Sequence, residues 1–186
     1  MSLEKSINEI KFARHFCKQG LLNHTRYFFK ELQKRNFVVN HHHEKICDAL
    51  DKVIRGETTK LIINIAPRYG KTEVAVKQFV SHALSWNPSA KFIHLSYSDS
   101  LALDNSEEIK DLIASKEYQE LFPNIEIKQD SNSKKKWYTN KGGGMYATSS
   151  GGQVTGFGAG TIDKEHDAHE DPRIYAYYYS NAKITC

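Results

Sequence analysis

The chain lacks the residues and runs that would place it among secreted, disulfide-rich or membrane proteins. Its 186 residues include three cysteines, which lie far apart with no Cys-x-x-Cys pair, so they indicate a reducing compartment and buried or incidental thiols. No apolar run approaches the ~20 residues that a membrane-spanning helix needs. The first residues, Met-Ser-Leu-Glu-Lys-Ser, contain no apolar signal core. We therefore expect a cytoplasmic protein that does not contact a membrane.

The sequence also lacks a large excess of positive or negative charge. The sequence has 26 Lys and Arg residues against 22 Asp and Glu residues, a net charge of +4. This balance permits a nucleic-acid partner but does not require one. Hydrophobic residues make up 39% and charged residues 26%, which is typical of a folded globular domain. The length allows about one domain with a substantial core.

Apolar residues at helical spacing predict six helices. They fall at 3–18, from a cap at Asn23 or Thr25 to about 35, at 41–55 after a cap at Asn40, and at 71–86, 99–115 and 117–122. Short apolar runs predict core strands at 60–65, 91–97 and 145–149 and edge strands at 125–128 and 136–139. Alternating strands and helices predict a parallel α/β sheet, preceded by a small, separate helical segment over 1–36.

The segment 61–73 carries the strongest functional signal. An Ile-rich strand runs into a tight turn, and Gly70-Lys71-Thr72 begins the next helix. This is the layout of a phosphate-binding P-loop, in which amides at the helix start point at phosphate. Lys71 would place its charge at the β- and γ-phosphates of ATP, and the Thr72 hydroxyl would bind Mg²⁺. Ile65 stands where the usual pattern has glycine, and the alternative is a solvated basic turn.

Two further clusters of side chains could bind a ligand or could simply lie on the surface. Lys134, Lys135, Lys136 and Trp137 combine cations with an aromatic ring, which suits contact with a DNA backbone and bases, or an exposed hairpin with a solvated charge run. The run 41–43 is three histidines. We expect no zinc there, because three consecutive residues of a helix point in three directions.

The last part of the sequence contains no apolar run of strand length. Residues 161–186 hold acidic residues and histidines, then a tyrosine cluster, and we expect them to be disordered. The glycine-rich stretch 150–160 before them is either a functional loop or a flexible crossover.

Four motifs in order resemble the large terminase subunit, the DNA-packaging ATPase of tailed phages. Asn40-His41-His42-His43-Glu44 resembles the segment before the P-loop of that family, and the stretch 66–73 resembles its variant Walker A loop with Pro-Arg. Ser96-Tyr97-Ser98 resembles the motif after the second core strand, and 152–158 resembles the loop before the Walker B strand. The resemblance covers about 36–160.

The resemblance implies a P-loop ATPase domain over 37–160 and the following roles. Residues that hold ATP and Mg²⁺ are Ala66, Pro67, Arg68, Tyr69, Gly70, Lys71, Thr72, Glu73 and, near adenine, His42. Arg68 is either a finger that stabilises γ-phosphate charge or a solvated arginine. The implied partners are double-stranded DNA, the portal protein and the small terminase subunit, with oligomers only in the assembled motor and with the host cytoplasm as the location.

The chain departs from the family after the glycine-rich loop. No apolar strand ending in paired aspartates follows, and no nuclease domain follows, so the sequence looks like a terminase cut short within its ATPase domain. We expect ATP binding with little or no hydrolysis, because Mg²⁺ and the attacking water would lack their acidic residue. The alternatives are a catalytically inactive nucleotide-binding or interaction fragment, and a helicase-like P-loop ATPase.

Overall fold

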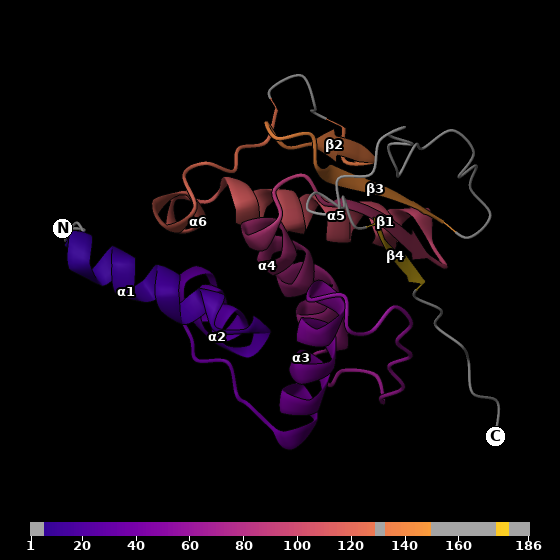
Figure 1. The fold of residues 1–186 in the computed structure, drawn as a ribbon. Helices are drawn as coiled ribbons and strands as arrows, with labels where there is room; N and C mark the ends of the chain where they lie inside the picture. The colour runs from indigo at the N-terminus through magenta and orange to yellow at the C-terminus, as the bar shows by residue number, and fades with distance from the viewer. Residues whose placement is uncertain (1–5, 129–132, 150–173, 179–186) are drawn as a thin grey trace.

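A layer of helices packs against a small mixed sheet. The computed structural model describes residues 6–128 and 133–149, and the backbone strand at 174–178 (Figure 1). The helices are α1 (Ile7–Lys18), α2 (Leu21–Gln33), α3 (His41–Ile54), the π-helix η1 (Glu73–Gln78), α4 (Phe79–Trp86), α5 (Asp99–Ala114) and α6 (Lys116–Leu121). The strands are β1 (Lys91–Ser96), β2 (Lys136–Tyr138), β3 (Gly144–Ser149) and β4 (Ile174–Tyr178). None of the helices in these ranges is long and apolar enough to cross a membrane.

The sheet has the strand order β2-β3-β1-β4. Strand β1 is parallel to both β3 and β4, whereas β2 runs antiparallel to β3 at the edge. The strands predicted at 91–97, 136–139 and 145–149 are thus confirmed. Of the strand predicted at 125–128 only a single bridge forms, between Ile127 and Thr139. The chain is therefore α/β, with a mixed rather than a wholly parallel sheet.

The strand predicted at 60–65 does not form, and this prediction was wrong. Residues 61–66 form an irregular coil beside α3 (Figure 1). Ile63 and Ile65 pack against the core, but Ile62 is 94% exposed. The sheet explains the failure, because β3 and β4 occupy both sides of β1 and leave this segment no place beside the central strand.

The tail also differs from the expectation. We expected no strand after residue 160, yet Ile174–Tyr178 forms β4, paired in parallel register with Lys91–Leu95 of β1. A tyrosine-rich segment with one isoleucine and one alanine suits a strand, even though it is not a long apolar run. The glycine-rich stretch 150–160 and the acidic residues at 163–171 lie outside the described residues.

Helix α2 begins before both of the predicted caps. Asn23 and Thr25 lie inside the helix, which starts at Leu21. The cap comes from α3 instead: both carboxylate oxygens of Asp51 accept the backbone N–H of Leu21, each at 3.1 Å. A carboxylate at a helix N-terminus is favourable both as a hydrogen-bond acceptor and by charge. Asn40 does precede α3, as predicted.

The first two helices share the core of the rest of the chain, so the expected separation was wrong. Phe28 of α2 is fully buried, and its ring centroid lies 5.4 Å from that of Tyr118 on α6. The Tyr118 hydroxyl donates to the backbone carbonyl of Ser81 on α4 at 2.8 Å. Cys17 of α1 and Cys47 of α3 are buried in the same core. Burial raises the pKa of the Cys47 thiol to about 12, so it is not a nucleophile at neutral pH.

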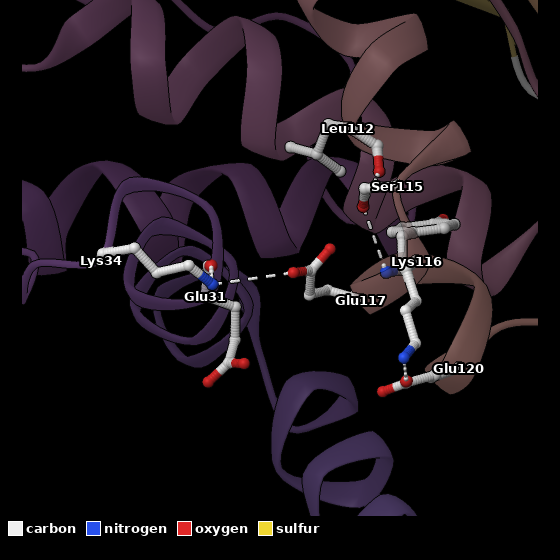
Figure 2. A network of polar contacts seen from close by, with 8 residues as sticks. Glu31, Lys34, Leu112, Ser115, Lys116, Glu117 and Glu120 are labelled. Atoms are coloured by element: carbon white, nitrogen blue, oxygen red, sulfur yellow. Dashed lines mark hydrogen bonds and ion pairs between the residues drawn. The ribbon is translucent and has the colours of Figure 1, made fainter. Parts of the chain in front are cut away.

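Polar contacts join α2 to the α5–α6 junction at the surface (Figure 2). The Lys34 ammonium lies 3.7 Å from Glu117. At the junction, Ser115 accepts the N–H of Tyr118 at 3.2 Å and donates to the carbonyl of Leu112 at 2.6 Å. Exposed ion pairs of this kind contribute about 0–1 kcal/mol, so the buried aromatic rings contribute more to holding these helices together.

The sheet contains a buried histidine that makes stability depend on pH. His94 of β1 is buried, and its Nε2 is 3.3 Å from the amide nitrogen of Asn105 on α5. Burial lowers the pKa of His94 from 6.5 to about 4. In this window the unfolded chain binds a proton that the folded chain does not, so stability is lost as pH falls.

We expect the free energy of unfolding to fall between pH 6.5 and pH 4, by up to about 3 kcal/mol from this residue. Urea denaturation at a series of pH values measures it. His94→Gln retains an acceptor for Asn105 but cannot be protonated, so its stability should fall less steeply in this range. An identical pH slope in the two proteins would refute the assignment.

Candidate nucleotide-binding site

The candidate loop joins the coil 61–66 to the helix that begins at Lys71. Its tip is exposed, with Ala66, Pro67, Arg68 and Tyr69 all open to solvent. Gly70, Lys71 and Thr72 are half-buried. The loop is thus accessible to a ligand on one side and packed against the protein on the other.

The backbone of the loop alternates in handedness. Arg68 has φ 69° and Gly70 has φ 74°, whereas Tyr69 and Lys71 are not among the described residues with positive φ. Of the described non-glycine residues only Arg68 and Lys34 have positive φ, a conformation that costs a side-chain-bearing residue about 1–2 kcal/mol. Residues of alternating handedness turn successive N–H groups toward one concave side, which is a form of anion-binding nest.

A helix follows the turn without a break. The carbonyl of Gly70 accepts the N–H of Val74 at 3.0 Å, which makes Lys71 and Thr72 part of the first helical turn. The helix then widens into η1 and continues as α4, so the predicted helix 71–86 is confirmed with a π-helical stretch inside it. The positive end of the helix therefore lies at this turn.

His43 contacts the loop from behind. Its Nε2 lies 3.2 Å from the carbonyl oxygen of Tyr69, and its Nδ1 accepts the backbone N–H of Asn40 at 3.1 Å. A Cβ added to Gly70 would lie 2.9 Å from His43 Nε2, so the ring packs directly on the glycine. Burial, and then the neighbouring His42, lower the pKa of His43, while the Tyr69 carbonyl opposes them. The imidazole is therefore neutral at pH 7.

His42 lies beside the same loop. Its Nε2 is 3.0 Å from that of His43, and its ring centroid is 5.6 Å from that of Tyr69. Phe37 completes the cluster, with its ring centroid 4.8 Å from that of His43. His42 is thus part of a group of four rings beside the loop. A contact between His42 and adenine stays a prediction.

Glu73 is engaged by its own helix. Its carboxylate accepts from Gln78 at 2.9 Å and lies 3.7 Å from the Lys77 ammonium. Glu73 and Lys77 also line a cavity of about 260 Å³ between η1, α2 and α5, together with Glu108. The carboxylate is therefore held along η1, on the side of α2 and α5.

The sequence predicts one ligand for Mg²⁺, the Thr72 hydroxyl, and binding of Mg²⁺ there stays a prediction. In the described part of the chain, no three His, Cys, Asp or Glu side chains gather where they would hold a metal ion. The half-buried Thr72 hydroxyl offers one oxygen ligand in the first helical turn, which fits Mg²⁺ that is bound mainly by phosphates and water. Thr72 alone does not make a metal site.

The basic cluster on β2 is only partly available to a ligand. Trp137 is fully buried and donates its indole N–H to Ser106 at 2.9 Å, so its assignment as a base-stacking residue was wrong. Lys134 is exposed but lies 2.6 Å from Glu107, whose hydrogen bond raises the Lys134 pKa. Lys135 and Lys136 are exposed and lie over the rings of Tyr146 and Tyr138.

Comparison with known proteins identifies no relative: no family model, no curated protein and no solved structure matches this chain.

Gly70 allows a test of the loop geometry. We expect Gly70→Ala to reduce the free energy of unfolding by more than the ~1–2 kcal/mol that a left-handed alanine costs, because its Cβ would also contact His43. Gly142→Ala is the matched control, since Gly142 has φ 83° and nothing within 4 Å of an added Cβ. Chemical denaturation measures both. Equal losses in the two variants would show that the His43 contact does not constrain the loop.

Proposed function

We propose that this chain binds ATP with Mg²⁺ at the loop 66–72, as the nucleotide-binding part of a DNA-packaging ATPase similar to the large terminase subunit. The observation that carries the proposal is the left-handed conformation at both Arg68 and Gly70, directly before a helix that starts with Lys71 and Thr72. Such a turn is a concave array of N–H groups, and the motif supplies a cation and a hydroxyl beside it.

A binding role of the loop would explain why Arg68, which is not a glycine, has a positive φ. A side-chain-bearing residue with positive φ persists where the surrounding structure determines it, and such positions gather at ligand sites. Arg68 is exposed at the tip, where its guanidinium is able to reach a γ-phosphate without leaving a buried partner. In this proposal Lys71 neutralises the β- and γ-phosphates, Thr72 contacts Mg²⁺, and Arg68 adds charge from the outer side.

The proposal is for binding more than for hydrolysis. Hydrolysis by P-loop enzymes needs an acidic residue that fixes Mg²⁺ and a group that orients water. Strand β1 has two neighbours, and the one later in the sequence is β4, whose sequence Ile-Tyr-Ala-Tyr-Tyr contains no carboxylate. This observation favours a nucleotide-binding unit with weak turnover, whether it acts in a packaging motor or as an inactive interaction unit.

Double-stranded DNA is the proposed substrate of the motor, with the portal protein and the small terminase subunit as partners and with oligomers in the assembled motor. The support is the resemblance of the motifs together with two exposed lysines, Lys136 on the edge strand β2 and Lys135 directly before it. A lysine pair at an edge strand has a second explanation, because such charges also prevent edge-to-edge aggregation.

A binding assay with a fluorescent ATP analogue and Mg²⁺ tests the nucleotide site. Lys71→Ala should weaken binding more than about tenfold, since it removes the cation at the phosphates. Lys60→Ala removes the same charge from an exposed position before the coil and should leave the affinity within about twofold. Equal affinity of wild type and Lys71→Ala would contradict the proposal.

The salt dependence of DNA binding tests the lysines. If both exposed lysines contact phosphates, the double variant Lys135→Ala/Lys136→Ala should lower the log–log salt slope by about two units. Lys134→Ala is the control and should change the slope little, because Glu107 already neutralises Lys134. An unchanged slope in the double variant would contradict DNA contact by these lysines and would favour their role in preventing edge-to-edge aggregation.

A further inference from the structure

We propose that His43 is the positioning residue of the nucleotide loop: its neutral imidazole holds the Tyr69–Gly70 peptide in the orientation that turns the Gly70 N–H toward phosphate. This inference rests on the proposed function for its ligand, but the contacts that carry it belong to the protein alone. No motif of the sequence assigns this role to His43.

The hydrogen bonds of His43 determine which ring nitrogen carries the proton. The Asn40 N–H needs an acceptor, and it finds one at His43 Nδ1, 3.1 Å away. Nδ1 is therefore unprotonated, and in a neutral imidazole the proton is then on Nε2. Nε2 is the atom that faces the carbonyl oxygen of Tyr69 at 3.2 Å, so the ring donates to the loop.

The ring itself has little freedom to move. His43 is only 6% exposed. The Phe37 ring packs on one part of it, and on another Gly70 approaches so closely that a Cβ at that position would lie 2.9 Å from Nε2. His42 lies 3.0 Å from the same nitrogen and can accept a share of its hydrogen bond. A ring fixed at Nδ1 and by its neighbours is a rigid support for whatever its Nε2 contacts.

The planar peptide group links the Tyr69 carbonyl, which His43 contacts, to the direction of the Gly70 N–H. The carbonyl of Tyr69 and the N–H of Gly70 belong to one planar trans peptide, so they point in opposite directions. Because His43 holds the carbonyl on the protein side, the Gly70 N–H must point away from α3. That is the direction in which an N–H of the concave turn would reach a phosphate oxygen.

Two substitutions separate this role from simple capping of α3. In His43→Gln the side chain has the length of His Nε2 and carries an amide N–H, so it still reaches Tyr69, and Gln at the third helical position also caps a helix start. In His43→Asn the oxygen takes the place of Nδ1 and still accepts the Asn40 N–H, but the side chain is too short to reach Tyr69. Both variants retain a cap, and only Gln retains the loop contact.

The experiment measures two quantities for the full chain. The first is hydrogen exchange of the Val74 amide without nucleotide, since this N–H bonds to the Gly70 carbonyl at 3.0 Å and reports on the loop. The second is the affinity for a fluorescent ATP analogue with Mg²⁺. We expect His43→Asn to speed exchange and to weaken binding by about tenfold each, the equivalent of one lost buried hydrogen bond. His43→Gln should remain within about threefold of wild type in both. His41→Asn, at an exposed neighbouring position, should change neither.

The outcomes distinguish this inference from the proposed function. If both His43 variants exchange like wild type, or if both lose protection equally and in step with their melting temperatures, His43 only caps or packs, and the inference is overturned. If wild type and Lys71→Ala bind the analogue equally weakly, the nucleotide site is refuted. The exchange measurement then still decides whether His43 holds the loop.

Discussion

The carboxylate of Asp51 joins three helices, and the position of the candidate loop depends on this junction. It accepts the Leu21 N–H at the start of α2, and one of its oxygens lies 3.5 Å from His82 Nε2 on α4. Asp51 therefore fixes α3 against both the N-terminal helices and the helix that follows the loop. The first turn of the same helix α3 carries His43. Because the contacts of Asp51 fix the C-terminal part of α3, they also fix the position of His43 relative to the loop. A shift of α3 would therefore disturb the contact between His43 and the loop.

The central sheet adds a second constraint, which acts by competition. A parallel sheet offers its central strand two neighbours, and in this chain β3 and β4 fill both. The Ile-rich segment before the loop alternates between partly buried and exposed residues, as a strand would, but it has no position beside β1 in the sheet. No strand therefore supports the loop from this side. Instead, His43 of α3 contacts the loop at Tyr69 and Gly70.

The sequence predicted those helices and strands that depend on interactions between residues close together in the chain. Helical spacing and the cap at Asn40 placed α3, and β-branched and aromatic runs placed β1 and β3. Non-local contacts decided the rest. No pattern shows that Asp51, thirty residues from Leu21, caps α2, or that Trp137 turns inward to donate to Ser106. The short strand β4 also depends on pairing with β1, because its own sequence gives a weak signal.

The candidate site divides in the same way. The turn at Gly70 and the helix that begins at Lys71 were predicted from the motif, because consecutive residues determine both. The binding roles of Gly70, Lys71 and Thr72 stay predictions. His43 was missed, since its role depends on a loop that lies 26 residues further along the chain. One local signal pointed to it: Asn40 caps α3, and the third residue of a capped helix often reaches back to the cap. A histidine at this position has a second ring nitrogen that can form another hydrogen bond. The sequence alone does not predict the partner of that nitrogen.

The π-helical turn after the loop fixes the site from its other side. In η1 the Glu73 carboxylate bonds to Gln78, five residues on, which is the spacing of a π-helix. Lys77 of the same turn pairs with Glu108 on α5, so the start of the helix is joined to the helix that covers β1 and β3. The loop is thereby held between α3, through His43, and α5, through η1. A loop fixed at both ends loses little further freedom when a ligand binds, and this reduces the entropic cost of binding. If the proposed function is right, the positive φ of Arg68 is present before the nucleotide binds.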